Sequence, residues 1–131
     1  MTTQHFHAVI WIDHHEAKVF HFNATDADHL TFHPNDPTMQ IHHKTNTIGS
    51  GHEQLDYFFL HDVTSAIADA GAVLIVGPGS AKTELMTHIT QHDSKLREKI
   101  KGVETIDHPT DGQIVAHARK FFRADHQLQP R

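Results

Sequence analysis

A short apolar run that ends in a glycine-proline-glycine break constrains the fold of this chain more than any other feature. Residues 73–76, Val-Leu-Ile-Val, are apolar and mostly β-branched, which is typical of a strand buried on both faces. Gly77, Pro78 and Gly79 then break the strand, and Ser80 is suited to cap a following helix. A doubly buried strand that feeds a helix indicates a parallel crossover, so we expect a layered α/β core.

Apolar periodicity predicts the other elements, with a polar turn at residues 13–16 that indicates a β-hairpin. The expected strands are Ala8–Ile12, Ala17–Phe22, Asp28–His33, Ala72–Val76 and Val103–Asp107, and the expected helices are Glu53–Ala70 with Gly71 as its stop, Ser80–Gln91, Asp93–Lys101 and Thr110–His126. The order β-β-β-α-β-α-β-α predicts a three-layer α/β fold with a ribonuclease-H-like motif. Its mixed five-stranded sheet would have residues 72–76 in the central position.

The length of 131 residues predicts a single domain over residues 1–131, with a core over about residues 7–124. A polar loop at residues 34–52 is expected to be flexible. The chain has no cysteine, which excludes disulfides and thiolate metal sites. It shows neither a signal peptide nor an apolar stretch of membrane-spanning length, so we expect a cytoplasmic protein without a membrane partner.

The charge is uneven along the chain. The net charge of −5 arises in residues 1–60, which have two cations and seven carboxylates, whereas residues 61–131 have nine of each. A chain without a strongly basic face is not expected to read DNA sequence. One strip, formed by Lys95, Arg97, Lys99 and Lys101, remains a candidate for phosphate contacts, and a solvated helix face is the alternative interpretation.

Two segments carry a resemblance to a known family. Residues 74–82, Leu-Ile-Val-Gly-Pro-Gly-Ser-Ala-Lys, resemble the fourth strand of the middle domain of eukaryotic and archaeal-type peptide-chain release factors and of Pelota-type rescue factors. The hairpin Trp11–Phe20 is similar to the opening of small bacterial proteins grouped with them as translational machinery or host-attachment proteins. The resemblance covers about residues 7–124 and implies a translation-associated protein of that fold.

One motif of the release factors is missing. Where their Gly-Gly-Gln tripeptide stands, this chain has Gly49-Ser50-Gly51-His52, without a glutamine to position a hydrolytic water. The resemblance therefore implies a non-enzymatic protein that binds the ribosome or RNA without peptidyl-tRNA hydrolysis, although an enzyme stays open as an alternative. Besides the basic strip, the expected RNA-binding residues lie in the polar loop, where long loops often carry function: His42, His43, Lys44, Gly49, Ser50, Gly51 and His52.

Two weaker motifs suggest other ligands. Gly77, Gly79, Ser80 and Lys82 open a helix and are candidates for binding a phosphate, but the P-loop spacing is absent and a tight packing turn is the favoured interpretation. His88 and His92 have the i,i+4 spacing of half a zinc site without an HExxH motif. We expect no cofactor, with zinc or another divalent metal bound by a histidine-rich protein as the alternative.

Two further functions stay open. A divalent-metal-dependent nuclease of ribonuclease-H-like fold would need clustered carboxylates, for which Asp13, Glu53 or Asp56, and Asp107 are candidates, although strand 72–76 supplies none. A homo-oligomer would form if an apolar helix face paired with a second copy. The sixteen histidines also make the surface charge sensitive to mildly acidic pH.

Overall fold

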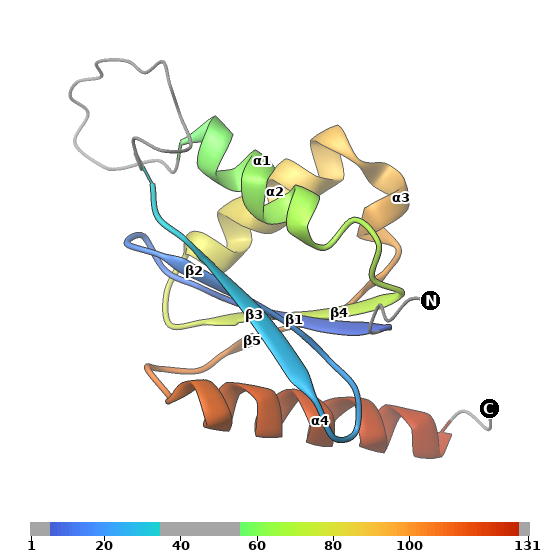
Figure 1. Ribbon diagram of the computed structural model, residues 1–131. Coiled ribbons are helices and arrows are strands. Elements are labelled where there is room, and N and C mark those ends of the chain that lie inside the picture. Colours follow the sequence, from blue (N-terminus) through green and yellow to red (C-terminus); the bar gives the residue numbers. More distant parts are fainter. Residues whose placement is uncertain (1–5, 35–55, 129–131) are drawn as a thin grey trace.

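Five strands form one mixed sheet with helices on both faces, as Figure 1 shows. The computed structural model describes residues 6–34 and 56–128, and the side chains of this range up to Arg123. The strands are β1 (His7–Ile12), β2 (Ala17–Phe22), β3 (Ala27–Phe32), β4 (Ala72–Gly77) and β5 (Ile100–Thr105), in the spatial order β3-β2-β1-β4-β5. The α/β architecture and the mixed five-stranded sheet predicted from the sequence are confirmed.

The pairing of the strands follows from their connections. The β1–β2 and β2–β3 turns are short, and both pairs are antiparallel, whereas β4 and β5 follow helices and run parallel to β1 and β4. The central strand is β1 and β4 is its neighbour, so the prediction that residues 72–76 form the central strand is wrong. β4 lies beside β1 with all six residues buried, because helices cover both of its faces.

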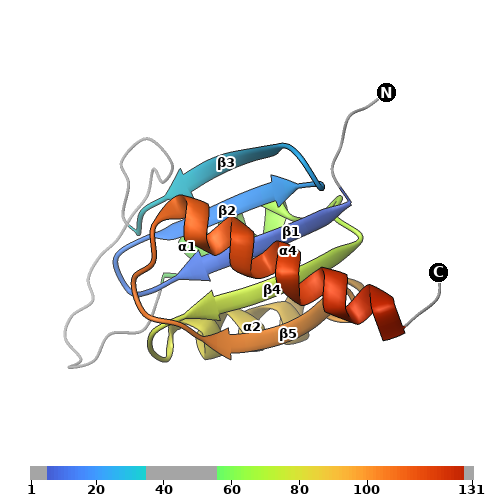
Figure 2. The ribbon, with the colours of Figure 1, turned by 90° about the horizontal axis from the view of Figure 1, so that it is seen from below.

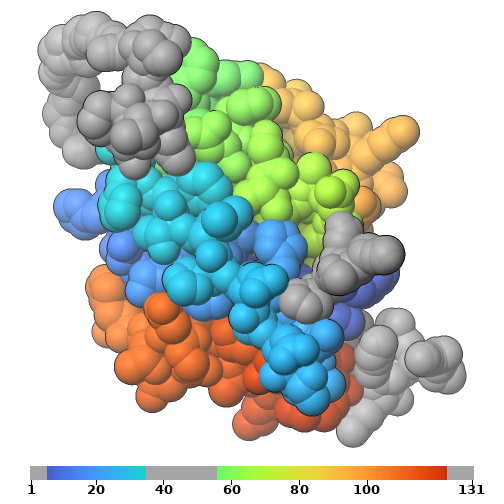
Figure 3. Space-filling view, in the orientation of Figure 1, coloured from blue at the N-terminus to red at the C-terminus, as the bar shows by residue number. Residues whose placement is uncertain are grey.

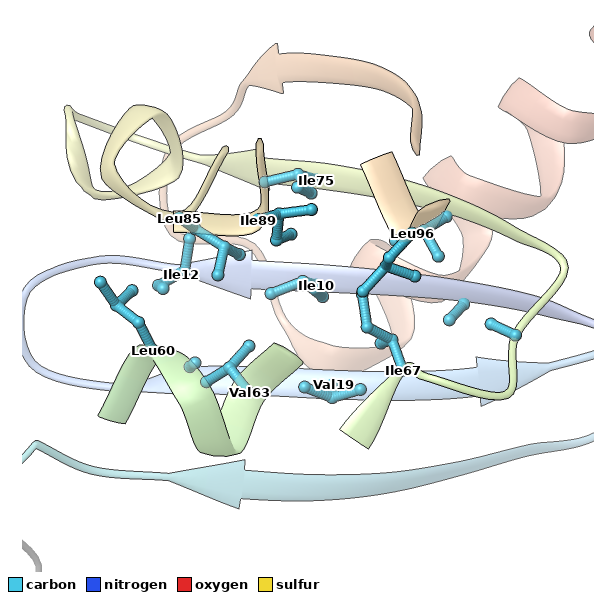
Figure 4. Close-up of a cluster of buried hydrophobic side chains, with 14 of the residues drawn as sticks. Ile10, Ile12, Val19, Leu60, Val63, Ile67, Ile75, Leu85, Ile89 and Leu96 are labelled. Atoms are coloured by element: carbon cyan, nitrogen blue, oxygen red, sulfur yellow. The ribbon is translucent and has the colours of Figure 1, made fainter. Parts of the chain in front are cut away.

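Three helices cover one face of the sheet: α1 (Tyr57–Ala66), α2 (Ala81–His92) and α3 (Ser94–Arg97). Their buried side chains meet alternate residues of the strands, since successive strand residues point to opposite faces. Figure 4 shows this cluster, in which Leu60 and Val63 of α1, Ile67 directly after it, and Leu85 and Ile89 of α2 pack over the strands. The strand residues beneath them include Ile10, Ile12, Val19 and Ile75.

A single described helix, α4 (Asp111–Leu128), covers the other face (Figure 2). Its stripe of Ile114, Val115, Ala118 and Phe122 packs on the second apolar cluster of the strands: Val9, Trp11, Phe20, Phe22, Ala72, Leu74 and Val76. The helix begins with a capping box, since Thr110 Oγ1 accepts the N–H of Gln113 and Gln113 Oε1 accepts the N–H of Thr110.

The first long helix is shorter than predicted. α1 begins at Tyr57 after the cap Asp56 and ends at Ala66, four residues before the expected end at Ala70. The backbone N–H groups of Ile67, Ala68 and Ala70 donate to carbonyls three residues earlier, which tightens the chain into turns. Gly71 does not stop the helix, because its N–H donates to Phe6 O at 2.7 Å at the entry to β4.

The boundaries between α3 and β5 also differ from the prediction. The expected helix Asp93–Lys101 ends at Arg97, and β5 begins at Ile100 instead of Val103. A register shift between β4 and β5 inserts Lys101 between the pairs Val73–Ile100 and Leu74–Gly102. This bulge disrupts the alternation of apolar residues by which a strand is recognised in a sequence.

The predicted flexible loop at residues 34–52 lies outside the described residues from residue 35 onward, as does Glu53. None of the described helices is both long and apolar enough to cross a lipid bilayer.

Candidate nucleic-acid interface

Two cations of the predicted basic strip lie on α3. Asp93 precedes the helix and its carboxylate accepts the N–H of Leu96 at 3.1 Å, while the Leu96 side chain is buried in the core beneath α1 and α2. With Leu96 held inward, Lys95 and Arg97 on either side of it are exposed. The helix is therefore fixed by its cap and its apolar anchor, and its cations project into solvent.

The other two cations lie beyond the helix. Lys99 is half-buried in the turn, and its carbonyl accepts the N–H of Val73 at 2.9 Å. Lys101 is exposed at the bulge of β5. The four cations are thus close in sequence but span a helix, a turn and a strand, so the prediction of one helix over Asp93–Lys101 is wrong. We call Lys95, Arg97, Lys99 and Lys101 the basic segment.

No ion pair between described residues involves the basic segment. The nearby carboxylates are Asp93, which caps α3, and the exposed Glu98. Cations that are exposed and unpaired with carboxylates remain available for phosphate groups. The basic segment is the part of the predicted interface that the structure describes, because residues 42–44 and 49–52 lie outside the described residues.

The turn between β4 and α2 is tightly packed at one end and open at the other. A Cβ on Gly77 would overlap the carbonyl oxygen of Ile12, whereas a Cβ on Gly79 would meet no atom within 4 Å. Ser80 precedes α2 but makes no side-chain cap, because its φ of −86° and ψ of −5° are already helical. Lys82 Nζ donates to Gly79 O at 2.5 Å. This geometry fits the packing turn, and the phosphate hypothesis stays a prediction.

His88 and His92 lie on the face of α2 that meets α1. Their ring centroids are 4.5 Å apart, and the ring of Tyr57 on α1 approaches both edge-on, at 5.2 and 5.5 Å. His61 stacks on Tyr57 at 5.9 Å. His88 is only 6% exposed, and its Nε2 has no hydrogen-bond partner among the residues that the structure describes. Burial lowers the pKa of His88, and the neighbouring His92 and His61 lower it further.

This histidine cluster does not by itself make a metal site. A tetrahedral zinc site takes four ligands, of which three or more normally come from the protein. Among the described residues no group of three histidine or carboxylate side chains is placed to hold a metal ion. His88 and His92 supply two nitrogens, and the metal alternative for this pair stays a hypothesis.

His108, which no sequence motif marks, contacts carboxylates that follow the carboxyl ends of β1 and β5. Asp107 Oδ1 lies 2.9 Å from His108 Nδ1, and Asp13 Oδ2 lies 3.6 Å from His108 Nε2. The hydrogen bond and negative charge of Asp107, followed by the nearby carboxylate of Asp13, raise the pKa of His108. Trp11 Nε1 donates to Asp107 O at 2.9 Å, which holds the start of this loop against β1.

Further histidines link the layers through carboxylates. His14 in the β1–β2 turn lies 2.9 Å from Glu84 on α2, and His117 on α4 lies 2.6 Å from Glu104 on β5. Lys18 on β2 also pairs with α4: its Nζ donates to Asp111 Oδ1 at 2.9 Å, which raises the pKa of this lysine. These pairs cannot be predicted from the spacing of the residues in the sequence, because only the fold brings the partners together.

The structure brings together only part of the proposed nuclease carboxylates. Asp13 and Asp107 meet at His108, but Asp13 Oδ1 is occupied by the N–H groups of His15 and Glu16 at 2.7 and 2.9 Å, as in a turn cap. Asp56 caps α1 by accepting the N–H of Phe59 at 3.1 Å. The ring of His108 therefore stands between two of the carboxylates that a metal ion would have to bind.

No protein-family model matches this chain, and no curated protein matches its sequence. Solved structures do share its fold. Pelota from Archaeoglobus fulgidus has a TM-score of 0.62 over 87% of this chain at 9% identity, and the archaeal translation termination factor aRF1 has 0.58 over 87% at 17% identity. Dom34 from S. cerevisiae, a translation termination-like factor involved in RNA quality control pathways that interacts with Hbs1, has 0.56 over 93% at 11% identity.

The chain spans about a third of the length of these structures, at 30%, 34% and 34% of each. The match is thus to one portion of longer chains, and the identities limit what it establishes to the fold. The predicted resemblance to a release-factor or Pelota domain is confirmed at this level.

Proposed function

We propose that the chain is a non-enzymatic, translation-associated protein that binds ribosomal RNA through the basic segment. The fold supports an association with translation, because it is shared with portions of a termination factor, of Pelota and of a factor of RNA quality control. Fold alone does not determine function, so the argument for RNA depends on the surface of this chain.

The observation that carries the proposal is the exposure of cations within one short stretch. Lys95, Arg97 and Lys101 are exposed, Lys99 is half-buried beside them, and none takes part in an ion pair between described residues. Phosphate contacts of this kind position a protein on RNA without reading sequence, and they weaken steeply as salt rises. Such contacts suit a chain whose net charge is negative and whose basic residues are local.

The absence of catalysis is part of the same proposal. The segment Gly49-Ser50-Gly51-His52 has no glutamine in the place of the release-factor tripeptide. We expect the segment with His42, His43 and Lys44 to add RNA contacts without hydrolysing peptidyl-tRNA. Programmed ribosomes that carry a labelled peptidyl-tRNA test this directly: release above the background rate would show that the chain is a hydrolase.

Sedimentation with purified ribosomes tests the RNA contact, and two double variants make a matched pair. Lys95→Gln with Arg97→Gln removes two cations from α3, and Lys120→Gln with Arg123→Gln removes two exposed cations from α4, on the opposite face of the sheet. We expect the α3 variant to bind about tenfold more weakly at about 0.1 M salt. Its slope of log affinity against log salt should fall by about 1.5, since each phosphate contact contributes roughly 0.7–0.9.

The α4 variant should bind like the wild type. Equal weakening of both variants would mean that net charge alone governs the interaction. Failure of the wild type to sediment with ribosomes, or to bind isolated ribosomal RNA at low salt, would overturn the proposal.

A further inference from the structure

Within the described residues, the outer edge of β3 has no lysine, proline or bulge, which are features that often protect the edge of a sheet. Native edges are blunted by lysine, proline, bulges or short strands, because an open edge pairs with other chains. β3 pairs with β2 over six consecutive residues without a bulge, and the segment Ala27–Phe32 has no lysine, arginine or proline. The opposite edge, β5, has both a bulge and Lys101. The two edges of this sheet are therefore not equivalent.

Backbone groups of β3 point away from the sheet. The N–H of Asn23 donates to Asp26 O at 3.0 Å and closes the β2–β3 turn. Because hydrogen-bonded pairs alternate along an antiparallel ladder, the pairs His21–Asp28 and Val19–Leu30 are the bonded ones. The amides of Ala27, His29 and Thr31 then face outward, where a further strand would bind.

Beside this edge lies a partly apolar surface. Leu30 is 52% exposed although it stands on the face of the sheet that α1 and α2 cover, opposite Val19. Phe32, two residues on, packs against the core of that face, and Phe58 on α1 is 43% exposed. In the space-filling view of Figure 3 the atoms of β3 form a stripe along the visible surface, bordered by those of α1.

The charge of this region is negative. Asp26 and Asp28 are exposed at the start of β3, and Asp62 lies half-buried on α1. Neither β3 nor α1 contains a lysine or an arginine. Arg119 reaches the β2–β3 turn from α4 but donates to the backbone oxygens of Asn23 and Asp26. The charge of this surface therefore favours a basic ligand.

We propose that β3 binds an extended, basic segment of a partner protein, which adds to the sheet as a sixth strand. The main-chain groups of His29 and Thr31 supply hydrogen bonds, and Leu30 contacts an apolar side chain of the segment. Asp28 stands two residues before Leu30 and so on the same face of the sheet, where it favours a lysine or arginine of the segment next to that apolar side chain. This surface is distinct from the basic segment in place and in charge, so the inference goes beyond RNA binding.

A synthetic probe and three variants of the full chain test the proposal. The probe is the N-acetylated octapeptide Thr-Lys-Thr-Val-Thr-Lys-Thr-Val, which places its lysines and valines on one face of an extended chain, and the same peptide with glutamate for lysine is its control. Thr31→Pro removes an outward N–H and leaves the bonded pairs with β2, a position where an edge strand tolerates proline. Leu30→Ser removes the apolar contact, and Val103→Ser on β5, where Val103 is 41% exposed, is the matched control.

We expect fluorescence anisotropy at low salt to detect the basic peptide and not the acidic one. Thr31→Pro and Leu30→Ser should weaken binding at least tenfold, and Val103→Ser should change it less than twofold. Hydrogen exchange of the His29 and Thr31 amides should be fast in the free chain and slow in the complex. Circular dichroism and thermal unfolding confirm that each variant is folded.

Three results would overturn the proposal. The first is a wild-type chain that does not bind the basic peptide, and the second is binding that Thr31→Pro leaves unchanged. The third is slow exchange of these amides without peptide: in a dilute monomer it would show that another segment of this chain pairs with the edge. The same protection in a concentration-dependent dimer would show that a second copy does so.

Discussion

Gly77 in β4 lies so close to the backbone carbonyl of Ile12 in β1 that a Cβ at this position would overlap the carbonyl oxygen. The two strands are parallel neighbours in the centre of the sheet, and both are buried. The obstacle is main chain in a buried strand, so relief requires movement of the sheet itself. This contact explains why the strand of the glycine-proline-glycine motif ends in a residue without a side chain.

Gly77→Ala should therefore destabilise the fold. We expect the free energy of unfolding to fall by about 1–3 kcal/mol, the range for overpacked core positions. Urea denaturation measures the change, with Gly79→Ala as the control, since a Cβ there meets no atom within 4 Å. Equal losses in the two variants would contradict a steric origin.

His88 should make the stability depend on mildly acidic pH. Burial lowers its pKa below the ordinary value of 6.5, and His92 and His61 add to the effect. Below that value the unfolded chain binds more protons than the folded chain, so the free energy of unfolding falls as the pH falls. Between about pH 7.5 and 5.5 the wild type should lose more stability than His88→Leu, in which the group cannot titrate.

Denaturation at a series of pH values checks this expectation. His15→Gln, at an exposed turn position, is the control and should keep the wild-type dependence. If His88→Leu loses as much stability on acidification as the wild type, the dependence has its origin in other groups.

His108 should titrate above an ordinary histidine, because Asp107 on one ring nitrogen and Asp13 near the other favour its charged form. Asp107→Asn should lower the pKa of His108 toward 6.5, since it removes the larger cause. The NMR signals of the imidazole measure the titration. Asp111→Asn, which alters the pair with Lys18 instead, should leave it unchanged.

The capping box of α4 should contribute measurably to stability. Thr110→Ala removes the acceptor for the N–H of Gln113 and should lower the free energy of unfolding by about 1 kcal/mol. Thr83→Ala, an exposed position inside α2, should have no such cost because alanine favours a helix. Thermal and urea unfolding compare the two, and a larger loss in Thr83→Ala would argue against the cap.

The layered fold could be predicted because its strongest signals are local. β1, β2 and β4 are short apolar runs bounded by turn residues, and their positions agree with the prediction within about a residue. The structure differs where tertiary contacts decide. β5 begins earlier than its apolar pattern indicates because a bulge at Lys101 interrupts the alternation. The sheet order, with β1 rather than β4 in the centre, depends on pairing that no local pattern encodes.

Less of the candidate site could be predicted. The cations of the basic segment were identifiable from their spacing, but their division among α3, a turn and β5 was not. The pair of His14 and Glu84 joins residues 70 positions apart, and the contact of Trp11 with Asp107 joins residues 96 apart. Such contacts exist only once the parallel strands bring their carboxyl ends to one edge.

Because α4 covers one face of the sheet, this face is exposed while the ribosome synthesises the chain. Trp11, Phe20 and Phe22 are made early, yet among the described elements the helix that shields them is the last to be synthesised. At a synthesis rate of roughly 5–20 residues per second, several seconds pass between the synthesis of these aromatic residues and that of residues 111–128. During that interval helices cover only one face of the nascent sheet. The other, apolar face is exposed to water and can bind chaperones until α4 packs on it.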